Sequence, residues 1–131
     1  MTYLWIALGG ALGSVGRYWL AETIIRRTEG PLPWGTIIVN ISGSFIIGVL
    51  AATAQVEGRW LATPSARQFL MIGVCGGYTT FSSFSLQTFH LAREGQWFAV
   101  GANIVLSVVL CLLGVWLGYL LGVWLNGTRG Q

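Results

Sequence analysis

The residues able to do chemistry in this chain are hydrogen-bonding side chains set inside long apolar segments. Two series occur at intervals of four residues: Thr36, Asn40, Ser44 and Gly48, and then Asn103 and Ser107. This spacing places each series on one face of a helix. Polar groups at membrane depth are costly. Their alignment therefore indicates either hydrogen bonds between helices or contacts with a passing ion, to which an asparagine amide can donate two hydrogen bonds.

The stretch GVCGGYTTFSSFS, residues 73–85, is a poor centre for a membrane helix. Gly76 and Gly77 permit unusual backbone angles, and Thr79 or Thr80 is suited to cap a restarted helix. We therefore expect a helix break here, with a simple glycine kink as the other interpretation. Unwound backbone at membrane depth is tolerated where it is buried in protein or lines a cavity. Transporters use such breaks to hold ions, with carbonyls facing cations and helix N-termini facing anions.

Phe81 and Phe84 are three residues apart and share a face of the restarted helix. Lipid contact or core packing is the ordinary role of such a pair. An aromatic ring also has a positive edge, so ring edges beside a helix break can line an anion path without a fixed charge that would trap the anion.

Catalysis is not indicated. His90 is the single histidine, and no carboxylate falls in the middle of an apolar segment. Neither a catalytic triad nor a metal site can be assembled from these residues. We expect that the protein is not an enzyme.

The elements that position these residues are membrane helices. Of 131 residues, 54% are hydrophobic and 8% charged, against about 25% charged in soluble domains. About 20 apolar residues span a bilayer as a helix. The sequence predicts four such spans in one domain over residues 1–131, at about 3–25, 35–56, 65–92 and 97–125. The expected fold is an all-α membrane protein with the third helix broken near its middle.

The loops carry conventional boundary signals. Pro31 and Pro33 interrupt a helix after the first span. Thr63 and Pro64 supply an N-cap and a first-turn proline for the third span. No basic cluster with interleaved aromatic residues occurs, so nucleic acid is not an expected partner.

The distribution of charged residues does not predict a single orientation of the protein in the membrane. With four spans both termini lie on one side of the membrane. The loop arginines then divide three against three: Arg59, Arg67 and Arg129 on the terminal side, and Arg26, Arg27 and Arg93 on the other. Because an excess of Lys and Arg marks the cytoplasmic side, this balance favours dual topology and an antiparallel homodimer. Dominance of a single arginine near the first helix is the alternative.

Small residues repeat at intervals of four in two spans. They are Gly9 and Gly13 in the first span, and Gly114, Gly118 and Gly122 in the fourth. Such patterns allow helix backbones to approach closely in lipid. We interpret them as favouring an oligomer.

Three motifs in order, GGALGSVGRYWL, GTIIVNISGSFIIG and GVCGGYTTFSSFS, resemble the Fluc (CrcB) family of fluoride channels, and the four-span plan covers essentially the whole chain. The resemblance implies a passive, fluoride-selective channel of the cell (inner) membrane that confers fluoride resistance. It also implies an antiparallel, dual-topology homodimer with two pores.

The resemblance further implies roles for individual residues. Phe81, Phe84 and Asn40 would line the anion pore, and Arg17 would lie in a vestibule near its entrance. Backbone carbonyls of Gly76 and Thr79 from both subunits would hold a structural sodium ion on the dimer axis. The family's fourth helix usually begins its polar track with a hydroxyl-bearing residue. Here the candidates are Asn103 and Ser107, and Thr36 joins the pore lining through its shared face with Asn40.

Two other functions compete with a channel. A small proton-coupled multidrug exporter also has four helices and dual topology, but needs a carboxylate inside the membrane. This chain has Gly13, Ser14 and Gly16 at that depth of the first helix. A non-transporting assembly subunit would explain the glycines but not Asn40, the helix break or the phenylalanine pair.

Overall fold

The computed structural model describes residues 1–56 and 60–127, and all regular structure in them is helical. The long helices are α1 (Thr2–Ile25), α2 (Trp34–Thr53), α5 (Phe81–Arg93) and α6 (Trp97–Gly127). Between α2 and α5 lie a short 3₁₀ turn η1 (Trp60–Ala62), α3 (Pro64–Arg67), the π-helix η2 (Gln68–Cys75) and α4 (Gly76–Tyr78). We refer to residues 64–93 as the third helical segment. The expected all-α class is confirmed for the described residues.

The helix boundaries follow the local signals. Thr63 caps α3, its side chain accepting a hydrogen bond from the Ala66 N–H, and Pro64 occupies the first turn. At the far end of α5, Gly95 has a φ of 74°. Glycine adopts this left-handed conformation readily, which lets the chain reverse into α6 within a few residues.

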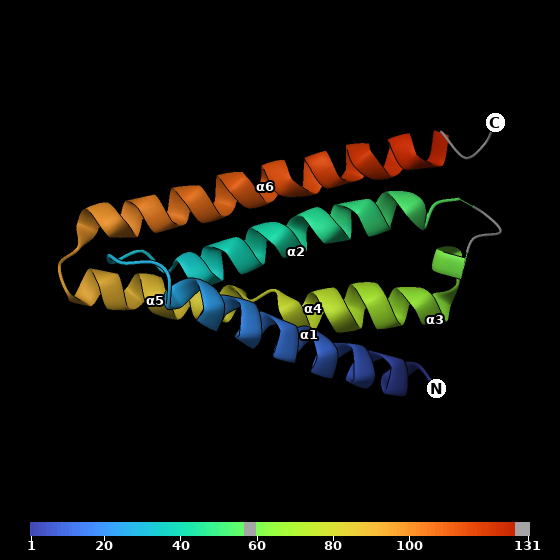
Figure 1. Cartoon of the computed structure of the whole chain (residues 1–131), viewed down its shortest axis with the longest axis horizontal. Helices are drawn as coiled ribbons and strands as arrows, with labels where there is room; N and C mark the ends of the chain where they lie inside the picture. Colours follow the sequence, from blue (N-terminus) through green and yellow to red (C-terminus); the bar gives the residue numbers. More distant parts are fainter. Residues whose placement is uncertain (57–59, 128–131) are drawn as a thin grey trace.

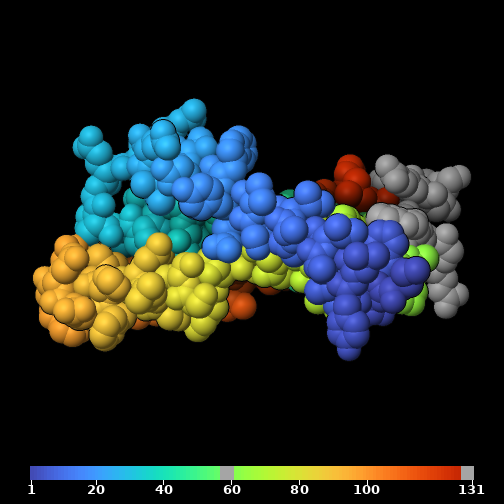
Figure 2. All heavy atoms as spheres, turned by 90° about the horizontal axis from the view of Figure 1, so that it is seen from below, coloured from blue at the N-terminus to red at the C-terminus, as the bar shows by residue number. Residues whose placement is uncertain are grey.

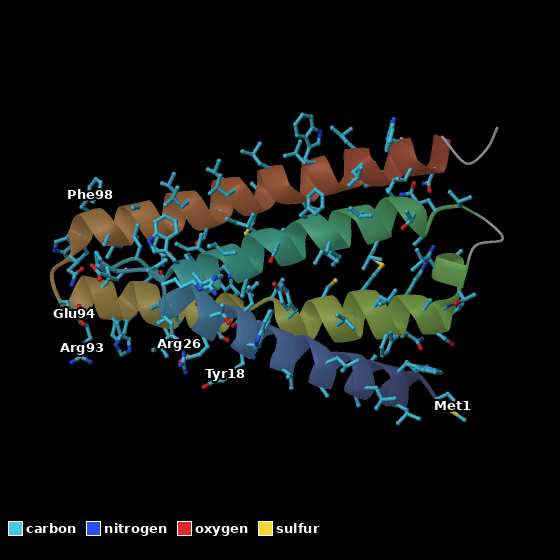
Figure 3. All side chains as sticks on the ribbon, in the orientation of Figure 1. Met1, Tyr18, Arg26, Arg93, Glu94 and Phe98 are labelled. Atoms are coloured by element: carbon cyan, nitrogen blue, oxygen red, sulfur yellow. The ribbon has the colours of Figure 1, made fainter. Side chains whose placement is uncertain are left out.

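The helices form an elongated bundle in which helical segments that follow one another in the sequence run in opposite directions (Figure 1). α2 and α6 run side by side, while α1 crosses the third helical segment. The start of α1 and the end of α6 lie at the same end of the bundle. Arg26, Arg93 and Glu94 lie at the opposite end (Figure 3). Figure 2 shows α1 lying across one face of the molecule, with α5 beside it toward the end that carries Arg93.

Three parts of the described chain are long and apolar enough to cross a membrane: Trp34–Thr53, Pro64–Arg93 and Trp97–Gly127. α1 is also long, at 24 residues. It is not among these three. Three of the four expected spans are therefore supported by length and composition.

The glycine repeats pack helices within one chain, which corrects their interpretation as oligomer contacts. A Cβ added at these positions would collide with the backbone of a neighbouring helix of the same protomer. Gly9 and Gly13 meet η2, and Gly118 meets Phe45 of α2. Since these faces are already occupied, they supply no argument for a second subunit. The physical reason for the pattern, close backbone approach, is unchanged.

Candidate ion-binding groove

The helical backbone is interrupted at Thr79 and Thr80, between α4 and α5. Thr79 has φ −79° and ψ 155°, and Thr80 has φ −150° and ψ 110°. We call these two extended residues the 79–80 link. Gly76 is helical, with φ −65° and ψ −36°. The unusual angles expected at the double glycine therefore fall just after it.

The double glycine serves a different purpose from the one expected. A Cβ on Gly77 would lie 2.5 Å from the carbonyl oxygen of Gly10, so this glycine lets α1 approach the third helical segment. A Cβ on Gly76 would meet nothing closer than 4.0 Å within the chain. Gly76 instead lines an open groove, described below.

Asn40 holds the 79–80 link in place. Its Oδ1 accepts a hydrogen bond of 2.7 Å from the Thr80 N–H, and its Nδ2 donates one of 3.0 Å to the Thr80 carbonyl. Both backbone polar groups of one extended residue are thus satisfied by one side chain from α2. In a continuous α-helix the Thr80 N–H would bond the Gly76 carbonyl. Asn40 takes that donor and leaves one amide N–H of its own for another partner.

Arg17 and Ser14 of α1 satisfy another carbonyl at the interruption. Arg17 Nε donates to the Gly77 carbonyl at 3.2 Å, and Ser14 Oγ donates to the same oxygen at 3.4 Å. Gly77 would otherwise pair with the N–H of Phe81, which begins the next helix. The arginine assigned to a vestibule therefore also packs against the interruption and compensates for one of its lost hydrogen bonds.

Thr80 caps α5, as one of the two expected threonines. Its Oγ1 accepts a hydrogen bond from the Ser83 N–H at 3.2 Å and donates one to Ser83 Oγ at 3.0 Å. Thr79 instead ends α4, with its N–H and its hydroxyl both donating to the Cys75 carbonyl. The side chains thus satisfy the backbone on both sides of the link.

An open groove of ≈ 430 Å³ lies beside this interruption. It runs between α2 and α6 on one side and η2, α4 and the start of α5 on the other. Most of the predicted site residues line it, together with Ser44 and the free cysteines Cys75 and Cys111: Asn40, Gly76, Thr79, Phe81, Phe84 and Ser107. Residues predicted from three separate spans therefore meet at one groove.

The two phenylalanines occupy different positions in this groove. Their ring centroids are 5.2 Å apart and the rings are inclined by 48°. Phe84 is 9% exposed, whereas Phe81 is 76% exposed. Phe84 is thus fixed within the protomer, and Phe81 projects from it.

Asn103 and Ser107 form a hydrogen-bonded series between α6 and α5. Asn103 Nδ2 donates to Thr88 Oγ1 at 2.8 Å, Thr88 Oγ1 donates to the Phe84 carbonyl at 2.7 Å, and Ser107 Oγ donates to Asn103 Oδ1 at 3.4 Å. Asn103 is fully buried. Only Ser107 of the pair lines the groove, so Asn103 lies one step behind it and connects the two helices.

Thr36 and Arg17 line a second, smaller cavity of ≈ 170 Å³. Thr36 is 7% exposed. This cavity, which we call the inner cavity, is lined by residues of α1, α2 and α5, including Ser83, and by Thr80. Apart from Asn103, each predicted site residue therefore lines one of two cavities, and Thr80 lines both.

The sequence matches the family described as "CrcB-like protein, Camphor Resistance (CrcB)" over residues 4–119. The chain belongs to this family. A fluoride-specific ion channel FluC of Methylocella silvestris is 52% identical to it over 130 residues, 99% of each chain. A FluC of Rhodospirillum rubrum is 56% identical over 126 residues, 96% of this chain and 98% of that one. One of Opitutus terrae is 54% identical over 129 residues, 98% of each.

The family assignment agrees with the resemblance drawn from the three motifs. This CrcB-like chain belongs to a family of ion channels rather than enzymes.

Some residues around the site were not identified from the sequence alone. Tyr78 OH lies 2.9 Å from Ser42 Oγ and ties α4 to α2. Gln87 lines the inner cavity with Oε1 buried and without a hydrogen-bond partner. Thr88 links α5 to α6 through Asn103. A signal for Gln87 was available, because it lies four residues after Ser83 on the same face of α5.

Proposed function

We propose that this protein is a passive, fluoride-selective channel that exports fluoride across the cell (inner) membrane as a multi-pass protein. The observation that carries the proposal is the groove, where Asn40, Phe81, Phe84 and Ser107 meet beside the 79–80 link. The names of the relatives, fluoride-specific ion channels, supply the identity of the ion.

The lining suits a small, strongly hydrated anion. Dehydration of fluoride must be offset by close hydrogen-bond donors, and Asn40 retains one amide N–H beyond its bond to Thr80. The positive edges of the Phe81 and Phe84 rings supplement these donors. Conduction requires that the anion is bound strongly enough to enter and weakly enough to leave. The hydrogen-bond donors and ring edges favour entry, and the lack of a fixed positive charge in the lining of the described groove allows the anion to leave.

We propose that a second, antiparallel copy covers the groove and completes two pores. Phe81 is 76% exposed in the protomer, and Gly76 opens onto the groove without a neighbour that requires a glycine there. A partner packed against this face would explain both features. The even division of arginines between the two ends supports insertion in both orientations. Arg59 and Arg129 lie outside the described residues.

A structural sodium ion fits the same face. Carbonyl oxygens suit hard cations, and unwound backbone supplies them in membrane proteins. The Thr80 N–H that a continuous helix would direct to the Gly76 carbonyl is bound by Asn40. Thr79 is extended and lines the groove with Gly76. We propose that these two carbonyls, with those of the antiparallel copy, hold the ion and so join the subunits.

α1 completes the membrane domain as the fourth span. Its polar residues, Ser14 and Arg17, both donate to the Gly77 carbonyl, so each has a hydrogen-bond partner inside the protein. Glu22 pairs with Arg26 at 3.2 Å near the end of α1. A proton-coupled exporter would need a carboxylate deeper in the membrane, and no observation favours that function.

Fluoride efflux from liposomes tests the proposal. Purified protein is reconstituted into vesicles loaded with potassium fluoride, and release after addition of a potassium ionophore is followed with a fluoride electrode. We expect rapid release that is not driven by a proton gradient. Protein prepared without sodium should lose its dimer and its flux together. Absence of release from vesicles that contain folded protein would reject the channel.

Dual topology has its own test. A cysteine introduced at an exposed end of the protein is labelled from each side of intact cells. Equal labelling from both sides is expected, and labelling from one side alone would contradict the antiparallel dimer.

A further inference from the structure

A pocket of ≈ 380 Å³ opens between the end of α2 and the start of the third helical segment. We call it the end pocket, because these two parts lie at the same end of the bundle as the end of α6 (Figure 1). Ligand pockets commonly have volumes of about 300–1,000 Å³. Its lining combines one cation and one amide with an apolar surface: Arg67 and Gln55, with Ala51, Ala54, Met71 and Ile72.

Arg67 is fixed at the end pocket by one hydrogen bond. Its Nη2 donates to the Ala54 carbonyl at 2.7 Å. A guanidinium has five N–H donors, and this is the one hydrogen bond that the Arg67 side chain makes within the described part of the chain. The side chain is exposed. Its remaining donors and its positive charge are therefore available to an anion in the pocket.

Gln55 is oriented so that it also presents donors. Tyr119 OH donates to Gln55 Oε1 at 3.2 Å, which ties the amide oxygen to α6. The Nε2 group carries two N–H donors, and neither bonds to a residue that the structure describes. Among the described residues that line the pocket there is no carboxylate. Both polar side chains of the lining therefore favour an anionic ligand.

The end pocket lies where helices reach the membrane surface. Two of the apolar segments long enough to span a membrane are Trp34–Thr53 and Pro64–Arg93. Gln55 follows the end of one, and Arg67 lies in the first turn of the other. Trp124, near the end of α6, is 62% exposed, and tryptophan is enriched at the membrane–water interface. Ile72 lies further into its span and is also exposed. The polar part of the pocket is therefore at head-group level, with its apolar part toward the acyl chains.

We propose that the end pocket binds an anionic phospholipid, with its head group at Arg67 and Gln55 and an acyl chain against Met71 and Ile72. Basic pockets between membrane helices bind anionic head groups in this way. Arg67 is the one charged residue of the described lining. A zwitterionic lipid would bring its own cation close to this arginine, so phosphatidylglycerol fits better than phosphatidylcholine. The site is independent of the proposed fluoride conduction. Because the pocket shares Met71 with the groove, a second copy of the chain is the competing occupant.

Native mass spectrometry of the purified, delipidated protein in detergent tests the site. Phosphatidylglycerol and phosphatidylcholine with the same acyl chains are titrated separately, and the half-saturating concentration of each is measured. We expect phosphatidylglycerol to bind about fivefold more tightly, as for one arginine beside an anionic lipid. Equal binding of the two lipids by the parent protein, whether the pocket is empty or covered by a second copy, would overturn the inference.

Arg67→Gln should remove this preference, because it removes the one charge of the described lining. The matched control is Arg93→Gln, the same change at an exposed arginine at the opposite end of the bundle (Figure 3). We expect Arg67→Gln to bind phosphatidylglycerol no better than phosphatidylcholine, and Arg93→Gln to keep the preference of the parent. A preference that survives in Arg67→Gln, or is lost equally in both variants, would contradict the site.

Gln55→Leu tests the pocket in case Arg67→Gln does not fold. The change lies at an exposed position, removes the amide donors and leaves the bond from Arg67 to Ala54 intact. We expect phosphatidylglycerol to bind about fivefold more weakly, as for the loss of one net hydrogen bond. Binding equal to that of the parent would show that the head group does not lie in the end pocket.

Inorganic phosphate separates a lipid site from a site for a free anion, because both ligands carry phosphate oxygens that an arginine can bind. It is added in excess as its ammonium salt during the phosphatidylglycerol titration, with ammonium acetate at equal ionic strength as the control. We expect the same lipid binding in both salts, since the buried acyl chain also contributes to affinity. Displacement of the lipid by phosphate alone would overturn the assignment to a lipid.

Discussion

Removing the Asn40 amide should destabilise the 79–80 link, because this side chain satisfies both polar groups of the extended Thr80 unit. Asn40→Ala deletes hydrogen bonds of 2.7 and 3.0 Å. A net hydrogen bond contributes about 1 kcal/mol in soluble proteins and about 0.6 kcal/mol between membrane helices. Two such bonds give an expected loss of about 1–2 kcal/mol in the free energy of unfolding, or roughly a 5- to 30-fold change in the folded-to-unfolded ratio.

The measurement is equilibrium unfolding of purified protein in detergent, followed by helical circular dichroism. Ser44→Ala is the control, because Ser44 lies one turn further along α2 and lines the same groove without appearing in the hydrogen bonds that hold the link. It should change the free energy of unfolding by less than about 0.5 kcal/mol. If Asn40→Ala were as stable as the parent, the amide would not hold the link, and the reasoning would be wrong.

Other substitutions separate the roles assigned to neighbouring residues. Gly77→Ala should destabilise the fold by about 1–2 kcal/mol, measured by the same unfolding, because its Cβ would lie 2.5 Å from a backbone oxygen of α1. Gly76→Ala should leave that stability intact and weaken the dimer, seen by size-exclusion chromatography; an unchanged dimer would contradict the proposed contact. Phe81→Ile and Phe84→Ile should suppress fluoride release while the dimer persists, and undiminished release in both would remove the rings from the pore. Arg17→Ala should lower the free energy of unfolding by about 1.5–3 kcal/mol, as expected for a hydrogen bond from a charged donor. An unchanged free energy of unfolding would show that the bond from Arg17 to the Gly77 carbonyl contributes nothing to stability.

Local chemistry predicted much of the structure. Thr63 and Thr80 both cap helices, since a threonine before a helical stretch can accept a hydrogen bond from the N–H three residues on. The apolar lengths predicted helices, and three of them meet the requirement for a span. The period of four predicted that Asn40 and Ser44 share a face, and both line the groove.

Features that depend on contacts between distant segments could not be predicted in this way. The interruption falls at Thr79 and Thr80 rather than at the double glycine because Asn40, about 40 residues away in sequence, captures the Thr80 peptide. Position 77 must be glycine because the backbone of α1 lies against it, and no pattern in the local sequence reveals that contact. A periodic pattern identifies a helix face but does not identify the partner that the face contacts.

The fourth helix illustrates the same limit. The spacing placed Asn103 and Ser107 on one helix face, and the family resemblance made both candidates for the pore. Asn103 is fully buried and bonded to Thr88, whereas Ser107 lines the groove. Similar side chains one turn apart thus have different surroundings, because α5 covers one of them and leaves the other at the groove.

The most direct test of the channel is a comparison of fluoride and chloride release from the same reconstituted protein. Vesicles loaded with either salt are measured in parallel, with protein-free vesicles as the baseline. We expect rapid fluoride release and chloride release close to the baseline. Equal release of the two anions, or release of neither by folded protein, would contradict it.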